Sequence, residues 1–399
     1  MNKRLEKKID AVMQLKREKA LLRQRRVISR ADTEASNVSF DDQMLVNFSS
    51  NDYLGLTHEP ALAEALYQAA LKYGVGSGAS PLVTGYSEAH QQLEQHLCEL
   101  TGFEAAALFS SGFGANHGLM TALFDSSDIV LTDKLIHASI IDGVSHSGAK
   151  LKRFSHNNLE HATKQLSKHP VSALITESVF SMDGDIAPLA ELSAATHDND
   201  ALFIVDDAHG FGVIGAGIGA KGVMTSTGQT VAIDILIITF GKALGCQGAA
   251  ILASKKIINY VVSHCRDYIY STALSPANAA LALAASQHVL ANKQLNAQLQ
   301  HNIDYFQKRA YELGLAMMPS TTAIQAIVVG CSDKVMIIAE RMREQGILVA
   351  AIRVPTVPKG TDRLRITLTA IHTKAQIDAC LNLLANSLKA STTTKVTLC

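Results

Sequence analysis

The chain has 399 residues, 47% of them hydrophobic, and its 36 Lys and Arg residues balance its 36 Asp and Glu residues. A chain of this length can bury a large core and is expected to form two lobes, and its charge balance excludes a global attraction to nucleic acid. We expect a cytoplasmic protein without a membrane partner, because the sequence lacks a bilayer-length apolar run, an apolar leader, a C-x-x-C pair and zinc-finger cysteine spacing.

The first 30 residues depart from this neutrality, with eleven Lys and Arg against three acidic residues. Leu5, Ile9, Val12 and Met13 recur at helical spacing, which predicts an amphipathic helix. Such a helix could be a basic arm for RNA or a membrane, a transit peptide, or a helix packed on the protein by its apolar face. We favour packing, because the acids are interspersed and aromatic membrane anchors are missing.

Apolar runs and turn residues divide the chain into three blocks. We expect an N-terminal helical arm (1–45), a large domain (46–285) and a small C-terminal domain (286–399). In the large domain, strand-like runs alternate with helical stretches, which predicts an α/β fold with a mostly parallel central sheet flanked by helices. The C-terminal block contains two further runs and predicts a smaller α+β domain. The expected strands are 105–109, 128–132, 171–176, 201–205, 234–239, 248–253, 324–329 and 364–368.

A glycine-rich turn follows the first expected strand of the large domain. The segment Ser110-Ser-Gly-Phe-Gly-Ala-Asn-His117 lies between that strand and a helix-compatible stretch, 115–124. Glycines at such a junction let backbone N–H groups approach an anion at the helix N-terminus. The segment could hold a phosphate, or it could be only a tight strand-to-helix turn.

Two later expected strands are followed by residues whose side chains could bind a cofactor or take part in catalysis. The run 201–205 leads into Asp206-Asp-Ala-His209, and the run 234–239 leads into Lys242. A lysine amine forms a Schiff base with the aldehyde of pyridoxal phosphate (PLP), and a carboxylate keeps the pyridine nitrogen protonated. Taken singly, the lysine could be a surface residue and the acidic segment a metal cluster or a helix N-cap. Hydroxyls of Thr239 and of Ser271-Thr272 could complete a phosphate shell.

A dinucleotide-like motif gives a competing signal. Gly217-Ile-Gly-Ala-Lys-Gly222 satisfies G-x-G-x-x-G, but it lies inside a glycine-rich stretch that begins at Gly210. The motif indicates dinucleotide binding only between a strand and a helix. We therefore do not expect a nucleotide at this segment.

The complete set of motifs resembles the α-oxoamine synthases, a family of PLP enzymes with the type I PLP transferase fold. The resemblance extends over about residues 20–390. It rests on Asn47-Phe-Ser-Ser-Asn-Asp-Tyr-Leu-Gly-Leu56, Gly76-Ser-Gly78, Ser111-Gly-Phe-Gly-Ala-Asn116, His137-Ala-Ser139, Phe180-Ser-Met-Asp-Gly-Asp185, Val205-Asp-Asp-Ala-His-Gly210 and Thr239-Phe-Gly-Lys242.

The resemblance implies roles for individual residues. Lys242 would hold the cofactor and move the substrate proton, Asp206 would pair with the ring nitrogen, and His137 would stack on the ring. The remaining cofactor contacts would come from Gly112, Phe113, Ser181, His209, Thr239, Ser271 and Thr272, with Ser271 and Thr272 reaching over from a partner subunit. Substrate contacts would come from Arg23, Asn51, His137, Arg353 and Thr356. No metal ligand is implied.

The resemblance also implies a reaction. Within the family the chain looks most like the members that condense L-alanine with pimeloyl-CoA or a pimeloyl carrier protein, with loss of CO2, in biotin synthesis. We then expect a homodimer with shared active sites. The open alternatives are the condensation of glycine with acetyl-CoA, the use of another acyl donor, a nucleotide-dependent oxidoreductase using the glycines at 217–222, and RNA binding by the basic arm.

Overall fold

The computed structural model describes residues 2–18, 21–23, 25–30 and 34–393. The strands are β1 (Ser29–Arg30), β2 (Asn37–Phe40), β3 (Gln43–Asn47), β4 (Ala105–Phe109), β5 (Ile129–Asp133), β6 (Lys150–Phe154), β7 (Ala173–Glu177), β8 (Leu202–Asp206), β9 (Ile235–Thr239), β10 (Ala249–Ala253), β11 (Ile324–Val328), β12 (Ile347–Leu348), β13 (Ala350–Ile352) and β14 (Arg363–Thr367).

The helices alternate with these strands through the large domain. They are α1 (Lys3–Glu18), α2 (Pro60–Tyr73), α3 (Glu88–Thr101), α4 (Gly112–Leu123), α5 (Ala138–Ser147), α6 (Leu159–Lys168), α7 (Leu189–His197), α8 (Lys255–His264), α9 (Arg266–Ile269), α10 (Pro276–Ala291), α11 (Lys293–Glu312), α12 (Ser332–Glu344) and α13 (Lys374–Thr393).

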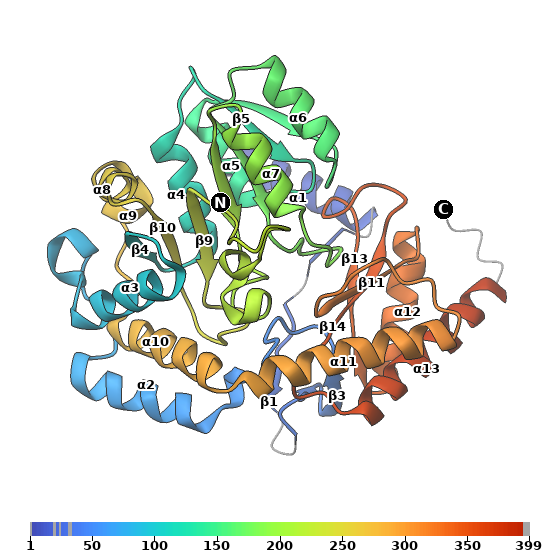
Figure 1. The fold of residues 1–399 in the computed structure, drawn as a ribbon. Coiled ribbons are helices and arrows are strands. Elements are labelled where there is room, and N and C mark those ends of the chain that lie inside the picture. The colour runs from blue at the N-terminus through green and yellow to red at the C-terminus, as the bar shows by residue number, and fades with distance from the viewer. Residues whose placement is uncertain (1, 19–20, 24, 31–33, 394–399) are drawn as a thin grey trace.

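The large domain is built on a seven-stranded sheet of order β4-β10-β9-β8-β7-β5-β6, with helices on both faces (Figure 1). Every pair from β9 to β6 is parallel, while β10 runs antiparallel to both of its neighbours. The carboxyl ends of β4, β9, β8, β7 and β5 therefore meet at one edge. In open α/β sheets this edge is where ligands bind.

Alternate residues of each central strand face two different cores. In β9, Ile235 and Ile237 pack with α4, α5 and α8, while Leu236 and Ile238 pack into the larger core on the opposite face. Strands β7 and β10 are buried over their whole length. Burial on both faces explains why these strands are continuous apolar runs rather than alternating patterns.

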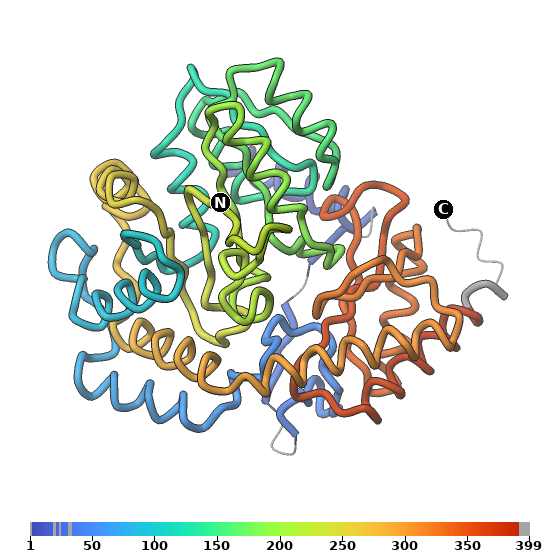
Figure 2. The backbone as a smooth tube through the Cα atoms, in the orientation of Figure 1, coloured from blue at the N-terminus to red at the C-terminus, as the bar shows by residue number. Residues whose placement is uncertain are grey.

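The small domain lies beside the large one and combines the two ends of the chain (Figures 1 and 2). Its three-stranded sheet has the order β11-β14-β13, and α11, α12 and α13 accompany it. A second sheet joins β1, β2 and β3 to β12, with β3 and β12 parallel. The blue N-terminal segment in Figure 2 thus runs next to the orange and red C-terminal elements.

The expected architecture is confirmed, namely a mostly parallel sheet flanked by helices with a smaller C-terminal domain. All eight expected strands form, each within two residues of its expected bounds. Strand β6 was not predicted, because its sequence Lys-Leu-Lys-Arg-Phe places charges at an exposed sheet edge. Of the expected arm, Lys3–Glu18 is helical, whereas 29–30, 37–40 and 43–47 are strands.

The N-terminal helix corrects one expectation. Helix α1 forms as predicted, but none of its residues is buried, and Leu5 and Leu15 are about half exposed. Packing of its apolar face on the body of the same chain was therefore wrong. The helix carries six basic and three acidic residues in 16 positions, which leaves only a narrow apolar stripe.

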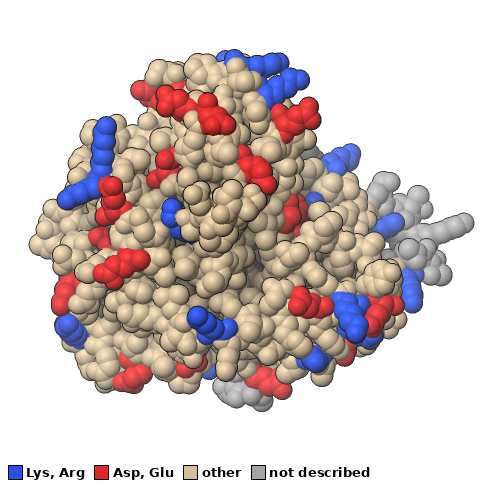
Figure 3. All heavy atoms as spheres, viewed as in Figure 1, with Lys and Arg blue, Asp and Glu red and all other residues tan. Residues whose placement is uncertain are grey.

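The surface and the helices agree with the neutral composition. On the face shown in Figure 3, basic and acidic side chains are interspersed among uncharged ones. None of the helices in the described part of the chain has an apolar stretch of the length that a membrane span needs.

Four cysteines, Cys98, Cys246, Cys265 and Cys380, are free thiols.

Candidate active site

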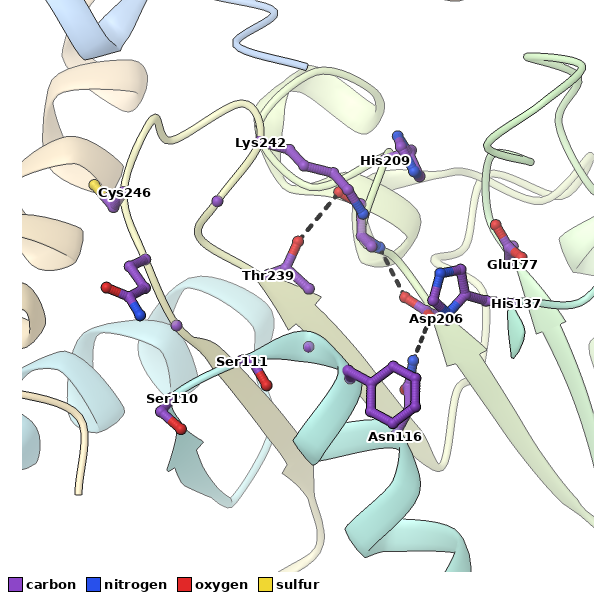
Figure 4. A pocket seen from close by; sticks show the side chains of 16 residues that line it. Ser110, Ser111, Asn116, His137, Glu177, Asp206, His209, Thr239, Lys242 and Cys246 are labelled. Carbon is purple, nitrogen blue, oxygen red and sulfur yellow. Dashed lines mark hydrogen bonds between the residues drawn. The ribbon is translucent and has the colours of Figure 1, made fainter. Parts of the chain in front are cut away.

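A cavity of about 330 Å³ opens at the edge where the parallel strands end. Figure 4 shows side chains from the ends of several strands projecting into it, with Ser110 and Ser111 just before α4 on the other side. The lining residues are Ser110, Ser111, Gly112, Phe113, Asn116, His137, Glu177, Asp206, Ala208, His209, Thr239, Gly241, Lys242, Cys246, Gln247 and Gly248.

The N-terminus of α4 forms one wall of the cavity. Ser111 caps the helix, and its Oγ accepts a hydrogen bond of 3.1 Å from the Gly114 N–H. A Cβ on Gly112 would lie 2.5 Å from Thr239 Cγ2, so only glycine allows this close approach. Unpaired N–H groups of the first helical turn and the helix dipole favour an anion at this wall.

Lys242 lies in the connection between β9 and the antiparallel β10. Burial lowers the pKa of its amine, although the negative charge of Asp206 opposes this shift. A lowered pKa increases the fraction of neutral amine, which is the form that condenses with an aldehyde. The position of Lys242 in the cavity agrees with its predicted role.

The two adjacent aspartates have different surroundings. Asp206 Oδ2 accepts from Asn116 Nδ2 at 2.7 Å and its Oδ1 accepts from the Ala208 N–H at 3.0 Å, so two donors stabilise a carboxylate that faces the cavity. Asp207 points away from the cavity, because its carboxylate accepts from Ser178 Oγ and from the Ala220 N–H. Of the two aspartates, only Asp206 therefore faces the cavity.

Two histidines line the cavity near Lys242 and Asp206 (Figure 4). His137 caps α5, and its Nδ1 lies 2.7 Å from Ser139 Oγ, which fixes the orientation of an exposed ring. His209 Nδ1 contacts the hydroxyl of Tyr53. Burial lowers the pKa of His209 well below its usual value and raises that of Tyr53 to about 12. Tyr53 therefore donates to neutral His209, and the His209 Nε2 carries the proton.

Arg365 is a site residue that the sequence pattern did not reveal. It is 5% exposed, and it donates from Nε to the Ser181 backbone carbonyl at 2.7 Å and from Nη2 to Asn51 Oδ1 at 3.0 Å. The structure thereby joins the predicted residues Asn51 and Ser181, although neither lines the cavity. The only sequence signal was a pair of arginines, Arg363 and Arg365, on one face of an otherwise apolar strand.

Three of the predicted substrate residues lie in a different cavity. Arg23, Arg353 and Thr356 line a space of about 540 Å³, together with Lys16 at the end of α1. The other walls are Leu21, Ala351, Ile352, Val354 and Pro355. This second cavity therefore combines apolar walls with three cationic side chains.

Ser271 and Thr272 do not line the cofactor cavity of their own chain. Both are exposed, and they border a small depression that also includes Ser110. The neighbouring Ala273 is tied to the 77–79 segment, because its N–H donates to the Ala79 carbonyl and its carbonyl accepts from Ser77 Oγ. The two hydroxyls are thus held at the outer surface of the chain.

The 180–185 loop connects this site to the small domain. Asp183 forms an ion pair with Arg363 of β14, and Ser320 Oγ and Thr322 Oγ1 both donate to the Gly184 carbonyl. His156 bridges the loop to β5, with Nε2 2.7 Å from Asp185 Oδ2 and Nδ1 2.9 Å from Asp133 Oδ1.

The spacing of His156, Asp183 and Asp185 could suit a metal ion. However, both nitrogens of the His156 ring contact carboxylates, and Asp183 is paired with Arg363. These contacts account for all three side chains, and we assign no ion here.

The cavity fits a phosphorylated pyridine aldehyde. It offers a helix N-terminus for the phosphate, a buried amine for the aldehyde and a carboxylate held by two donors for the ring nitrogen. The buried Glu177 Oε1, which also faces this space, has no hydrogen-bond partner within the described residues. A buried polar atom of this kind indicates that the site is completed by a ligand.

Comparison with known proteins agrees with this fit. Residues 43–384 match the model of the aminotransferase class I and II family. An 8-amino-7-oxononanoate synthase from Yersinia pestis (strain Pestoides F) is 43% identical over 382 residues, covering 94% of this chain and 97% of that protein. One from Cronobacter sakazakii (strain ATCC BAA-894) is 46% identical over 340 residues, covering 85% and 88%.

Solved structures show the same relationship. A serine palmitoyltransferase from S. paucimobilis with a bound PLP–myriocin aldimine aligns with a TM-score of 0.89 at 26% identity, over 97% of this chain and 99% of that one. An 8-amino-7-oxononanoate synthase from Francisella tularensis aligns with a TM-score of 0.76 at 30% identity, over 87% and 98%.

The His156 bridge predicts a pH dependence of stability. Burial lowers the pKa of His156, but hydrogen bonds to Asp133 and Asp185 outweigh burial and raise the pKa to about 9. The protonated ring therefore stabilises the folded state fully below pH 6.5, and this contribution is lost as the pH rises through 9. The difference in melting temperature between wild type and His156→Gln should shrink from pH 6 to pH 9.

His161→Gln is the matched control, because the ring nitrogens of His161 contact Ser155 and Gln165 rather than carboxylates. This variant should follow the pH trend of the wild type. A difference for His156→Gln that stays constant from pH 6 to pH 9 would show that the bridge is not charged.

Proposed function

The chain belongs to the aminotransferase class I and II family and is a PLP-dependent acyltransferase, and we propose that it acts as an 8-amino-7-oxononanoate synthase. The proposed reaction joins L-alanine to a pimeloyl thioester and releases CO2, as one step of biotin synthesis. The synthases from Yersinia pestis and Cronobacter sakazakii support the reaction type by their identity over most of the chain.

The second cavity carries the proposal for the acyl substrate. A pimeloyl chain is a run of methylene groups that ends in a carboxylate. Apolar walls such as Ile352 and Val354 suit the methylenes, and the cations Lys16, Arg23 and Arg353 suit the carboxylate. An acetyl group has neither part and would leave this cavity unused.

The cofactor supplies an aldehyde that condenses with amines and a ring that accepts the electron pair of a substrate carbanion. Lys242 is proposed to hold the cofactor and, once the substrate amine has displaced it, to take the proton from the substrate Cα. The carboxylate of Asp206 would hold the proton on the ring nitrogen, and the exposed ring of His137 would cover one face of the cofactor. The α4 N-terminus at Gly112 and Phe113, with Thr239, holds the phosphate.

Arg365 and Asn51 are proposed to bind the carboxylate of the amino acid. Three of the five N–H groups of Arg365 donate to Ser181, Asn51 and Thr367, which leaves donors for a ligand. Its charge lies close enough to Lys242 to lower the pKa of the lysine. A guanidinium at this place would hold the substrate carboxylate near the reacting amine until CO2 is lost.

A substrate assay tests the proposal directly. Purified protein loaded with PLP should release CO2 and form 8-amino-7-oxononanoate from L-alanine and a pimeloyl thioester, detected by mass spectrometry. Pimeloyl-CoA and a pimeloyl carrier protein should be compared, because the geometry does not favour either carrier. Turnover of glycine with acetyl-CoA above that of alanine with both pimeloyl donors would establish the alternative, a 2-amino-3-ketobutyrate ligase.

Arg23→Ala should lower kcat/KM for the pimeloyl thioester by about ten- to a hundredfold, because a charge-assisted hydrogen bond contributes about 1.5 to 3 kcal/mol. An uncharged acyl thioester of equal length should be used almost as well as by the wild type. Arg25→Ala is the matched control, since Arg25 is an exposed arginine of the same segment outside the lining of the cavity. Equal losses for both thioesters would assign Arg23 to the fold or to the carrier instead.

We also propose a homodimer in the cytoplasm. Apolar side chains that are more than half exposed occur in the 75–83 segment, at the start of α4 and next to Ser271, and exposed apolar groups of this kind favour a partner surface. They are Val75, Leu82, Val83, Phe113 and Tyr270. Ser271 and Thr272 lie on this surface and are proposed to reach the phosphate bound by the other subunit. Cell fractionation that recovers the protein with membranes would contradict the location.

Mixed dimers test the sharing of sites. A Lys242→Ala chain should be inactive alone, and a Ser271→Ala/Thr272→Ala chain should be weakened alone. In a heterodimer of the two, one site has every residue, so its activity should exceed that of either homodimer. Purified heterodimers without any gain would show that the phosphate shell comes from one chain.

A further inference from the structure

Glu177 is a buried acid in the cofactor cavity to which neither the sequence motifs nor the steps above give a role. It is the last residue of β7, its backbone is in register with Asp206 on β8, and its side chain lines the cavity. The residue is 3% exposed, and its Oε1 has no partner among the described residues. Figure 4 shows Glu177 on the far side of Asp206 from the α4 N-terminus.

The surroundings decide which of the two neighbouring acids carries the charge. Burial raises the pKa of Glu177 well above its usual value, and the nearby charges of Asp206 and Asp133 raise it further. Lys242 and the Ser181 N–H act in the opposite direction but do not outweigh burial. Asp206 accepts two hydrogen bonds whereas Glu177 Oε1 has no donor among the described residues, so Glu177 is the acid of the pair that holds a proton.

The other charged groups do not alter this assignment. Asp133 is hydrogen bonded to His156, and the protonated His156 ring balances the charge of the Asp133 carboxylate. His209, which also lines the cavity, is neutral because burial lowers its pKa. In the loaded site the amine of Lys242 is bonded to the cofactor and is no longer a free ammonium partner for Glu177.

The order of the strands indicates which part of the cofactor Glu177 meets. In PLP, the carbon that bears the aldehyde lies between the carbon that carries the phosphate arm and the carbon that carries the phenolic oxygen. The phosphate wall follows β4, Lys242 follows β9, and Asp206 ends β8, so β7 lies farther along the edge from the phosphate. The phenolic oxygen therefore points to the side of the cavity where Glu177 lies.

We propose that Glu177 is a second acid of the cofactor site, which stays protonated and donates a hydrogen bond to the phenolic oxygen of bound PLP. It acts beside the predicted contacts of His209 and Ser181 in the same region. A donor at this oxygen withdraws negative charge from it, so the cofactor-bound nitrogen of Lys242 holds its proton less tightly. This inference rests on the PLP site and is independent of the acyl substrate.

The test uses the PLP-loaded protein without substrate and follows its visible absorbance against pH. Glu177→Gln keeps a neutral donor of the same size, so the midpoint of the spectral change should stay within about 0.5 pH unit of the wild type. Glu177→Met keeps the length but removes the donor, and its midpoint should rise by about one unit or more, the scale of one charge-assisted hydrogen bond.

Infrared difference spectra of the loaded proteins give an independent readout if Glu177→Met does not fold. Burial also raises the pKa of Asp207 and of Glu94 to about 7, so these acids contribute protonated-carboxyl bands in every variant. The wild type should show at neutral pH a further carbonyl stretch of a protonated carboxyl group that is missing in Glu177→Gln. Glu191→Gln, a change at an exposed acid of α7, is the control and should retain this band. A band unchanged in Glu177→Gln, a large midpoint shift in Glu177→Gln, or an unshifted Glu177→Met would each overturn the proposal.

Discussion

The site depends on one constraint, the common edge at which β4, β9, β8, β7 and β5 end. Strand pairing fixes the order of these ends, and each end delivers a different group to the same space: a helix N-terminus, an amine, two carboxyl groups and an imidazole. Because the strands are buried on both faces, their ends cannot shift without disturbing two cores. The sheet thus sets the spacing between the phosphate wall and the acids, and the loops only orient the side chains.

The small domain contributes two arginines that contact loops of the large domain near the cavity. Strand β14 directs Arg363 to Asp183 and Arg365 to Ser181 and Asn51, so one strand face holds both the 180–185 loop and the segment after β3. His156 holds the same loop from the side of β5. The guanidinium of Arg365, which we propose as the binding group for the substrate carboxylate, is therefore positioned by contacts that also connect the two domains. Loosening the loop would move Arg365 relative to Lys242.

The sequence predicts those parts of the fold and site that are local. Continuous apolar runs mark the buried strands, and Asp206 and Lys242 directly follow such runs, so their meeting at one edge can be inferred. Strand β6 was not predicted from the sequence, because it lies at an exposed edge of the sheet and its charged residues do not form an apolar run. Arg365 was not predicted because it lies inside β14 and its contacts come from distant segments. Glu177 ends β7 as Asp206 ends β8, but its position beside Asp206 follows only from the pairing of the two strands. The exposed apolar stripe of α1 shows that amphipathicity predicts a helix but not the surface that covers it.

The antiparallel β10 has a consequence for how the chain reaches its active form. Strands β9 and β10 are close in sequence, so the turn that carries Lys242 forms from local contacts. The phosphate wall follows β4, which pairs with β10 across a much longer separation, with Phe109 opposite Ala249. Pairings between distant segments form slowly, because closing a long loop costs entropy before any contact repays it. If PLP binds Lys242 and the α4 N-terminus as proposed, it can contact both only after this pairing. Tight binding during refolding would then report completion of the sheet, and the bound cofactor would stabilise the sheet by mass action.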